Sequence, residues 1–206
     1  QYYRVHNPWL QIKCLRFLQY FKEPQGALWS SLSSVILRIL SRGENEHDSV
    51  NIMNVSYALI FEAIALVISW GVTDTSGDHF ELREMTHKLL GRFISVNDAN
   101  IKYLALDMLA RVCKVDGVDE TMQAYSNTAV SSLTDADMSV RKRALEVIFL
   151  ITNEKNATSM VSDLVSALVT AEESLREDMV VKIAILAERF YENIRWYVDT
   201  LIEVIV

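Results

Sequence analysis

The stretch DADMSVRKRALEVIFLIT, residues 135–152, joins a short polar segment to a run with apolar residues at helical spacing. Within it, Asp137 precedes Val140 and Arg141, and Ala144 follows three residues after the arginine. An aspartate at this place accepts hydrogen bonds from the free amides of the first helical turn and suits the positive end of the helix dipole. The arginine can reach back to that aspartate or across to a neighbouring helix, and the small alanine allows close helix packing. The stretch therefore predicts a helix that begins directly after Asp137.

The same frame of residues recurs along the chain at a nearly regular spacing. Upstream it reads Asp98-x-x-Ile101-Lys102-x-x-Ala105, and downstream Glu172-x-x-Leu175-Arg176-x-x-Met179. Weaker copies read Asn7-x-x-Leu10-Gln11-x-x-Cys14 and Asn54-x-x-Tyr57-Ala58-x-x-Phe61. The fifth position of the frame falls at 11, 58, 102, 141 and 176, in steps of 47, 44, 39 and 35 residues. A period of this length, with two helices in each repeat, is typical of HEAT and armadillo arrays.

Helical periodicity divides the chain into about ten amphipathic segments. They are expected at 8–22, 27–42, 50–70, 79–95, 98–115, 120–133, 138–153, 156–170, 174–191 and 194–206. Residues that end helices fall in the breaks, as at Pro24, Gly43, Gly71 and Gly117. We therefore expect an all-α fold, an α-solenoid of HEAT/armadillo-like hairpins in which each hairpin contacts mainly its neighbours. Residues 1–206 are expected to form a single segment of this solenoid.

The composition favours packed helices and argues against nucleic-acid binding. Half of the 206 residues are hydrophobic, and Pro (2) and Gly (6) are scarce, which disfavours a turn-rich β architecture. The net charge of −7 gives no excess of cations for phosphate contacts, so we expect no nucleic-acid partner. The longest apolar stretch, Tyr57 to Trp70, is interrupted by Glu62 and is shorter than the about 20 residues that cross a bilayer.

No catalytic, cofactor or metal site is predicted. The sequence contains no P-loop, GxGxxG, GxSxG or HExxH motif. The four histidines are scattered, and Glu84 with His87 lacks the second such pair that a two-metal helical bundle needs. Cys14 and Cys113 are expected to be buried free thiols. The basic triplet at 141–143 could contact a phosphate or an acidic peptide, but is more simply the frame arginine with two solvated neighbours.

Six stretches are short individually but specific together. They are YYRVHNPWLQIKCLRFLQYF (2–21), FEAIALVI (61–68), KLLGRFI (88–94), NIKYLALDML (100–109), SVRKRALEVIFLI (139–151) and, within 176–205, REDMVVKIAILAERF followed by WYVDTLIEVI. Their order and spacing agree along the whole chain, and together they resemble the adaptins, the large subunits of clathrin adaptor complexes. The combination of NPWLQIK, KIAILAE and WYVDT is most similar to the alpha class, which belongs to the plasma-membrane endocytic adaptor.

The resemblance implies that residues 1–206 are the middle part of an adaptin trunk, with both ends cut from a longer chain. In that family the trunk is a non-catalytic scaffold that associates with a sigma subunit, a mu subunit and a second large subunit. The complex is cytoplasmic and peripheral at the plasma membrane, in clathrin-coated pits, where it selects cargo for endocytosis. The resemblance implies contacts with clathrin and with phosphoinositide membrane only for regions before Gln1 or after Val206. No residue of 1–206 is therefore assigned to these contacts.

Two other interpretations remain open: another adaptin class (gamma, delta, epsilon or beta), and a HEAT-repeat scaffold of a nuclear transport receptor or a phosphatase. Such scaffolds share the aspartate and Val-Arg frame but not WYVDT or NPWLQIK. The sequence departs from the adaptin pattern at VHN before Pro8 and in the loops at 41–51 and 70–80. It names no partner-binding residue. The residues expected to be structural are Asn7, Gln11, Asp98, Lys102, Asp137, Arg141, Ala144, Glu172 and Arg176.

Overall fold

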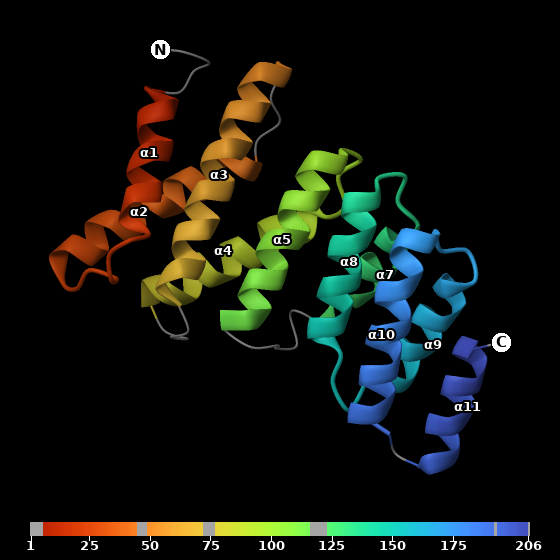
Figure 1. Cartoon of the computed structure of the whole chain (residues 1–206). Coiled ribbons are helices and arrows are strands. Elements are labelled where there is room, and N and C mark those ends of the chain that lie inside the picture. The colour runs from red at the N-terminus through yellow and green to blue at the C-terminus, as the bar shows by residue number, and fades with distance from the viewer. Residues whose placement is uncertain (1–5, 45–48, 72–76, 116–122, 192, 206) are drawn as a thin grey trace. The chain divides into compact units, whose positions relative to one another are not determined.

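The computed structural model describes residues 6–44, 49–71, 77–115, 123–191 and 193–205. Within these ranges the chain forms ten α-helices and two short 3-10 helices, and no strand (Figure 1). The predicted all-α fold of about ten helices is therefore confirmed. The α-helices are α1 (Pro8–Leu18), α2 (Ala27–Leu40), α3 (Val50–Trp70), α4 (Gly77–Phe93), α5 (Ala99–Val115), α7 (Ser126–Ser131), α8 (Met138–Ile151), α9 (Ala157–Leu168), α10 (Glu173–Arg189) and α11 (Ile194–Ile205), and the 3-10 helices are η1 (Ser41–Glu44) and η2 (Ser132–Thr134).

Most predicted segments agree with a helix to within two residues at each end. The largest difference is at α1, which ends at Leu18 rather than at residue 22. There the amides of Tyr20 and Phe21 bond to carbonyls three residues back instead of four, so the helix tightens into a turn. The break expected at Gly117 lies outside the described residues. The segment expected at 120–133 lies partly outside them, and its described part includes α7 and η2 over 126–134.

The helices fall into two compact units. Unit 1 comprises Gln1–Val96 and Lys114–Gly117, and unit 2 comprises Asn97–Cys113 and Val118–Val206. The interpretation of residues 1–206 as one segment of a longer array concerns the whole protein and remains a prediction.

In unit 1, α1 packs against α3, and α2 packs against both α3 and α4. Figure 1 shows α1 and α3 side by side, with α2 and α4 crossing behind them. The rings of Tyr57 and Phe61 on α3 meet Phe93 at the end of α4, with centroid distances of 5.0 and 5.1 Å. Aromatic pairs of this kind add to the free energy gained by burying the rings.

Helix α3 is long and apolar enough to cross a membrane by length and composition, with 21 residues and a mean hydropathy of 1.9 in its most apolar window. It exceeds the apolar stretch considered from the sequence because the helix already begins at Val50. Yet 56% of that window is buried inside the protein. The carboxylate of Glu62, halfway along the helix, accepts hydrogen bonds from Arg16 and Gln19. These features are those of a central helix in a packed helical array.

In unit 2, α8 packs against α10, with α7 against α8 and α9 against α10 in a second row behind them (Figure 1). Helix α11 contacts α10 and α9. Helix α8 buries one stripe of its surface, which consists of Val140, Ala144, Leu145, Val147, Ile148 and Ile151. This is the stripe that the 3.6-residue periodicity of residues 138–153 predicts.

Candidate functional site

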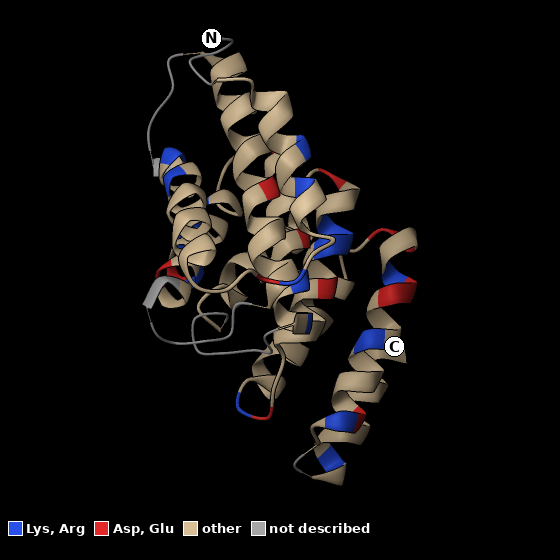
Figure 2. Ribbon diagram, turned by 90° about the vertical axis from the view of Figure 1, so that its left-hand side faces the viewer, with Lys and Arg blue, Asp and Glu red and all other residues tan. Residues whose placement is uncertain are grey.

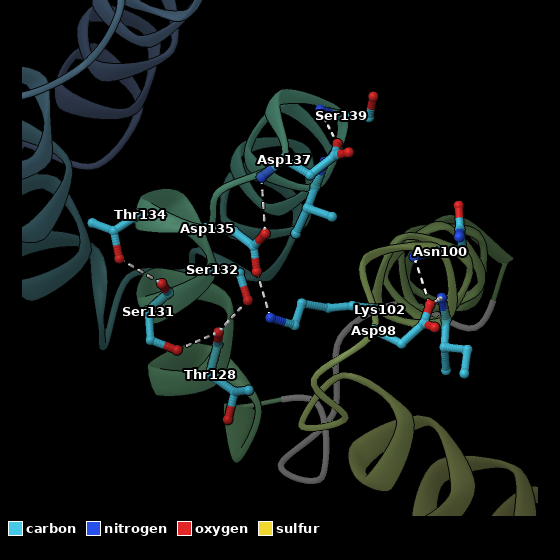
Figure 3. A network of polar contacts seen from close by, with 12 residues as sticks. Asp98, Asn100, Lys102, Thr128, Ser131, Ser132, Thr134, Asp135, Asp137 and Ser139 are labelled. Atoms are coloured by element: carbon cyan, nitrogen blue, oxygen red, sulfur yellow. Dashed lines mark hydrogen bonds and ion pairs between the residues drawn. The ribbon is translucent and has the colours of Figure 1, made fainter.

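The two aspartates that begin the best copies of the frame hold the first turns of α5 and α8. The Asp98 carboxylate accepts from the amides of Asn100 at 2.9 Å and Ile101 at 3.1 Å. The Asp137 carboxylate accepts from the amides of Ser139 at 2.7 Å and Val140 at 3.3 Å (Figure 3). Each side chain therefore satisfies two of the amides that a helix start leaves unpaired.

The other three copies do not cap their helices, so the capping prediction is wrong at Asn7 and Asn54. Asn7 has a left-handed backbone (φ 43°) and its side chain makes no cap bond. Glu172 precedes α10 without a side-chain cap bond, because its longer side chain extends to Arg141 instead. Asn54 lies inside α3, which begins at Val50. A residue in the middle of a helix cannot cap its start.

Two of the three cations at the fifth position of the frame reach forward, across to the start of the next long helix, whereas the third bonds to a carbonyl before its own helix. The ammonium of Lys102 on α5 pairs with Asp135, which lies just before α8 (Figure 3). The guanidinium of Arg141 on α8 pairs with Glu172, just before α10, at 2.9 Å. Arg176 donates to the Ala171 carbonyl at 2.9 Å, and Gln11 donates to the His6 carbonyl. In unit 2 the frame thus links α5 and α8 each to the turn that begins the next long helix.

Asp135 is the most strongly held carboxylate of this network. Its side chain is 14% exposed and that of Lys102 is 17% exposed. Besides Lys102, it binds the amide of Asp137 at 3.0 Å. The hydrogen bond from the Lys102 ammonium, followed by that from the Asp137 amide, lowers the pKa of Asp135 below its ordinary value of 3.8. The sequence left two partners open for the cation of the frame, its own cap or a neighbouring helix; the second is correct for Lys102, but no local pattern identified Asp135 as the acid.

The prediction of solvated neighbours for Arg141 is wrong at Arg143. The Arg143 guanidinium pairs with Asp107 at 3.2 Å and with Glu146, and donates to the Tyr103 hydroxyl at 3.2 Å. Desolvation lowers the pKa of Arg143, but the Tyr103 hydroxyl and the two carboxylates outweigh it and raise the pKa above its ordinary value. A guanidinium with three such partners has few donors left for a phosphate.

The small residues of the frame are buried in unit 2. Ala105 and Ala144 are fully buried, as is Met179 at the same position of the downstream copy. In unit 1 the corresponding Cys14 is exposed, so its predicted burial is wrong, whereas Cys113 is buried as expected. Cys14 faces outward because α1 turns Ile12 and Leu15 toward α3.

Unit 1 exposes many large apolar side chains on α1, the turn after it, and α2. They are Trp9, Leu10, Phe17, Tyr20, Phe21, Leu28 and Val35. An apolar groove of about 610 Å³ runs between Phe17 and Phe21 on one side and Leu28 and Val35 on the other. Contiguous exposed apolar surface is typical of places where another helix or protein packs.

No group of three or more His, Cys, Asp or Glu side chains that could hold a metal ion occurs among the described residues. Lysines and arginines are mixed with acidic residues along the helices of that part of the chain (Figure 2). The site that the structure offers is therefore a set of packing and ion-pair positions, together with the surface of unit 1.

Sequence comparison places these features in a known context. The model of the family described as "Adaptin N terminal region" matches residues 1–206. The chain is 37% identical over 205 residues to AP-2 complex subunit alpha-1 of Arabidopsis thaliana, covering 99% of this chain and 20% of that protein. It is 36% identical to AP-2 complex subunit alpha-2 of Dictyostelium discoideum, over 99% of this chain and 20% of that protein. AP-1 complex subunit gamma-1 of Arabidopsis thaliana is 29% identical, over 98% of this chain and 21% of that protein.

Among solved structures, the fold is similar to that of a crystal structure of an engineered protein. The TM-score is 0.54 at 14% sequence identity, and the match covers 98% of this chain and 92% of the other. At this identity the similarity concerns the fold alone. The chain spans about a fifth of the length of the curated relatives that it matches.

Proposed function

Since the chain belongs to the family of adaptin N-terminal regions, we propose that it is a non-catalytic scaffold segment of a clathrin adaptor large subunit. Within the family we assign it to the alpha class, because its identity to AP-2 alpha subunits (37 and 36%) exceeds that to an AP-1 gamma subunit (29%). The observation that carries the proposal is this similarity over nearly the whole chain. The helical hairpins, with their capped and ion-paired repeat starts, suit a protein segment that presents a binding surface and catalyses no reaction.

The partners in this proposal are the other subunits of the adaptor: a sigma subunit, a mu subunit and a second large subunit. Clathrin and phosphoinositide membrane are contacted by regions outside residues 1–206. The protein then acts in the cytoplasm, at the plasma membrane in clathrin-coated pits, where the complex selects cargo. The AP-2 and AP-1 relatives are named as subunits of complexes, which supports assembly with other subunits.

The frame residues have a structural role in this proposal. Asp98 and Asp137 fix the starts of α5 and α8. Lys102 and Arg141 then tie each helix to the turn that begins the next long helix. Fixed starts and fixed spacing would hold the hairpins at one register, as a scaffold that presents a surface to other subunits requires.

Co-purification tests the assignment. The tagged protein, expressed in its native cells, is expected to bring down sigma, mu and second large subunits, identified by mass spectrometry. A tagged helical-repeat protein of similar size and charge serves as the control. Recovery of a small GTPase with transport cargo, or of a phosphatase catalytic subunit, would instead identify a scaffold of another class. We also predict neither hydrolase activity nor nucleotide binding for the chain. Titration with ATP should therefore give no heat of binding, and a reproducible isotherm would contradict the predicted lack of nucleotide binding.

A further inference from the structure

A hollow of about 770 Å³ opens in unit 1 where the turn after α1 meets the end of α3 and the start of α4. Four aromatic side chains line it, namely Tyr20, Phe21, Trp29 and Trp70. They come from three different elements, and their exposure grades from 9% at Trp29 to 87% at Tyr20. The hollow is therefore a pocket with a buried aromatic wall and an exposed aromatic rim.

The inner wall is held in place by contacts among its own rings. Trp29 stacks on the imidazole of His79 with centroids 4.3 Å apart, and meets Trp70 edge-on at 6.0 Å. The indole N–H of Trp70 donates to the Phe21 carbonyl at 3.1 Å. Because this bond uses the one polar atom of Trp70, that residue offers the hollow ring surface and no free indole donor.

Glu23 supplies a negative charge on the same lining. Its Oε1 is hydrogen-bonded to His79 Nε2, and its side chain is 29% exposed. Among the described residues, His79 is the partner that the structure gives this carboxylate. The bond to His79 occupies Oε1, which leaves Oε2 for a further donor. Lys22 also lines the hollow and is exposed, so its ammonium is the charge that opposes a bound cation.

We propose that this hollow binds the side chain of a lysine presented by a partner protein. Ring faces attract an ammonium group through their negative quadrupole, and the Glu23 carboxylate attracts it directly. The methylene groups of a lysine bury well against Tyr20 and Phe21, whose rings form the exposed rim. An anion meets the opposite conditions, since the carboxylate and the ring faces repel it. This inference stands apart from the adaptor role, so its failure would leave that role unchanged.

A pair of peptides that differ only in the ammonium group tests the proposal on the 206-residue chain. The probes are acetyl-Gly-Lys-Gly-amide and the same peptide with norleucine, whose side chain has the same four carbons with a hydrogen in place of the ammonium. Binding is followed by the NMR signals of the indole N–H groups, assigned through Trp29→Phe and Trp70→Phe. The lysine peptide is expected to shift the Trp70 and Trp29 signals in a saturable way. Equal shifts with norleucine would overturn the proposal and show an apolar pocket only.

Three variants give the sign of the charge that the hollow prefers. Glu23→Gln keeps an oxygen that can accept from His79, and is expected to weaken lysine-peptide binding by up to about fivefold. Glu154→Gln removes the same charge at an exposed position of unit 2 and should leave binding unchanged. Lys22→Ala should strengthen binding by about twofold, because it removes the opposing charge. If Lys22→Ala weakens binding, or Glu23→Gln matches Glu154→Gln, the hollow does not select a cation.

Discussion

The two units of the chain stack their helices by different means. In unit 2 the frame copies start with capping aspartates at Asp98 and Asp137, and their cations pair with an acid ahead of the next long helix. In unit 1 the fifth frame position holds Gln11 or Ala58, neither of which is charged. The helices form in both units, so apolar burial decides whether they form and stack. The polar frame adds fixed starts and spacing in unit 2.

Unit 1 relies on its central helix and on aromatic contacts. Helix α3 buries ten of its residues. Buried rings also meet between helices, as in the pair of Phe61 and Phe93 at 5.1 Å. Side chains of this size gain about 1.5–3 kcal/mol each on full burial, far more than one exposed ion pair. Unit 1 therefore forms without the cap bonds and the frame cations. It also has an exposed apolar surface on α1 and α2.

The largest expected difference between the units comes from enlarging the small frame residue. Ala144→Phe should lower the free energy of unfolding by about 1–3 kcal/mol, because Ala144 is fully buried and the larger ring forces its neighbours apart. Cys14→Phe, at the same frame position in unit 1, should change it by less than about 0.5 kcal/mol, because Cys14 is exposed. Urea unfolding followed by circular dichroism measures both. Equal losses of stability would show that this frame position lies at an equally tight helix contact in both units.

Removing a cap should have the next largest effect. Asp137→Ala is expected to lower stability by about 1 kcal/mol, because two amides of α8 lose their acceptor. Glu172→Ala should lower stability by no more than about 0.3 kcal/mol, since Glu172 makes no cap bond and is exposed. Asp178→Ala, an exposed position inside α10, is the control for loss of an acidic residue. Faster amide exchange confined to the first turn of α8 would locate the effect, whereas equal losses at Asp137 and Glu172 would contradict it.

The sequence predicted the helices well because each helix carries its own apolar stripe and its own break residues. It predicted the caps at Asp98 and Asp137 for the same reason, since a cap bond joins residues two or three apart. It failed where the choice depends on three-dimensional neighbours. For Lys102 the sequence left open a partner in its own cap or on a neighbouring helix, and it could not identify the acid, which is Asp135, 33 residues away. The hollow around Trp29 and His79 unites residues about 50 apart, and local spacing carries no signal for it.

The buried pair of unit 2 should make part of the stability depend on pH. Because the pKa of Asp135 is lowered by folding, its ionised form stabilises the fold above its ordinary pKa of 3.8. That stabilisation is lost as the pH falls from about 3.8 through the lower folded value. Asp135→Asn should therefore be less stable than the parent chain by about 1 kcal/mol between pH 5 and 7, and the difference should shrink below pH 4. If the stability difference between the parent chain and Asp135→Asn stays constant down to pH 3, the ionisation of Asp135 is not its cause.

The ion pair of unit 1 should show the smallest effect. Arg16 binds Glu62 at 2.8 Å, but the Arg16 side chain is 68% exposed, so solvent screens the attraction. A double-mutant cycle with Arg16→Met and Glu62→Gln should give a coupling of about 0.2–0.5 kcal/mol, and 1 M salt should suppress most of it. The matching cycle with Lys102→Met and Asp135→Asn should give a larger coupling that salt changes little, because both side chains are more than four-fifths buried. Equal couplings in the two cycles would mean that burial does not distinguish these links, and the contrast between a polar unit 2 and an apolar unit 1 would then rest on the caps alone.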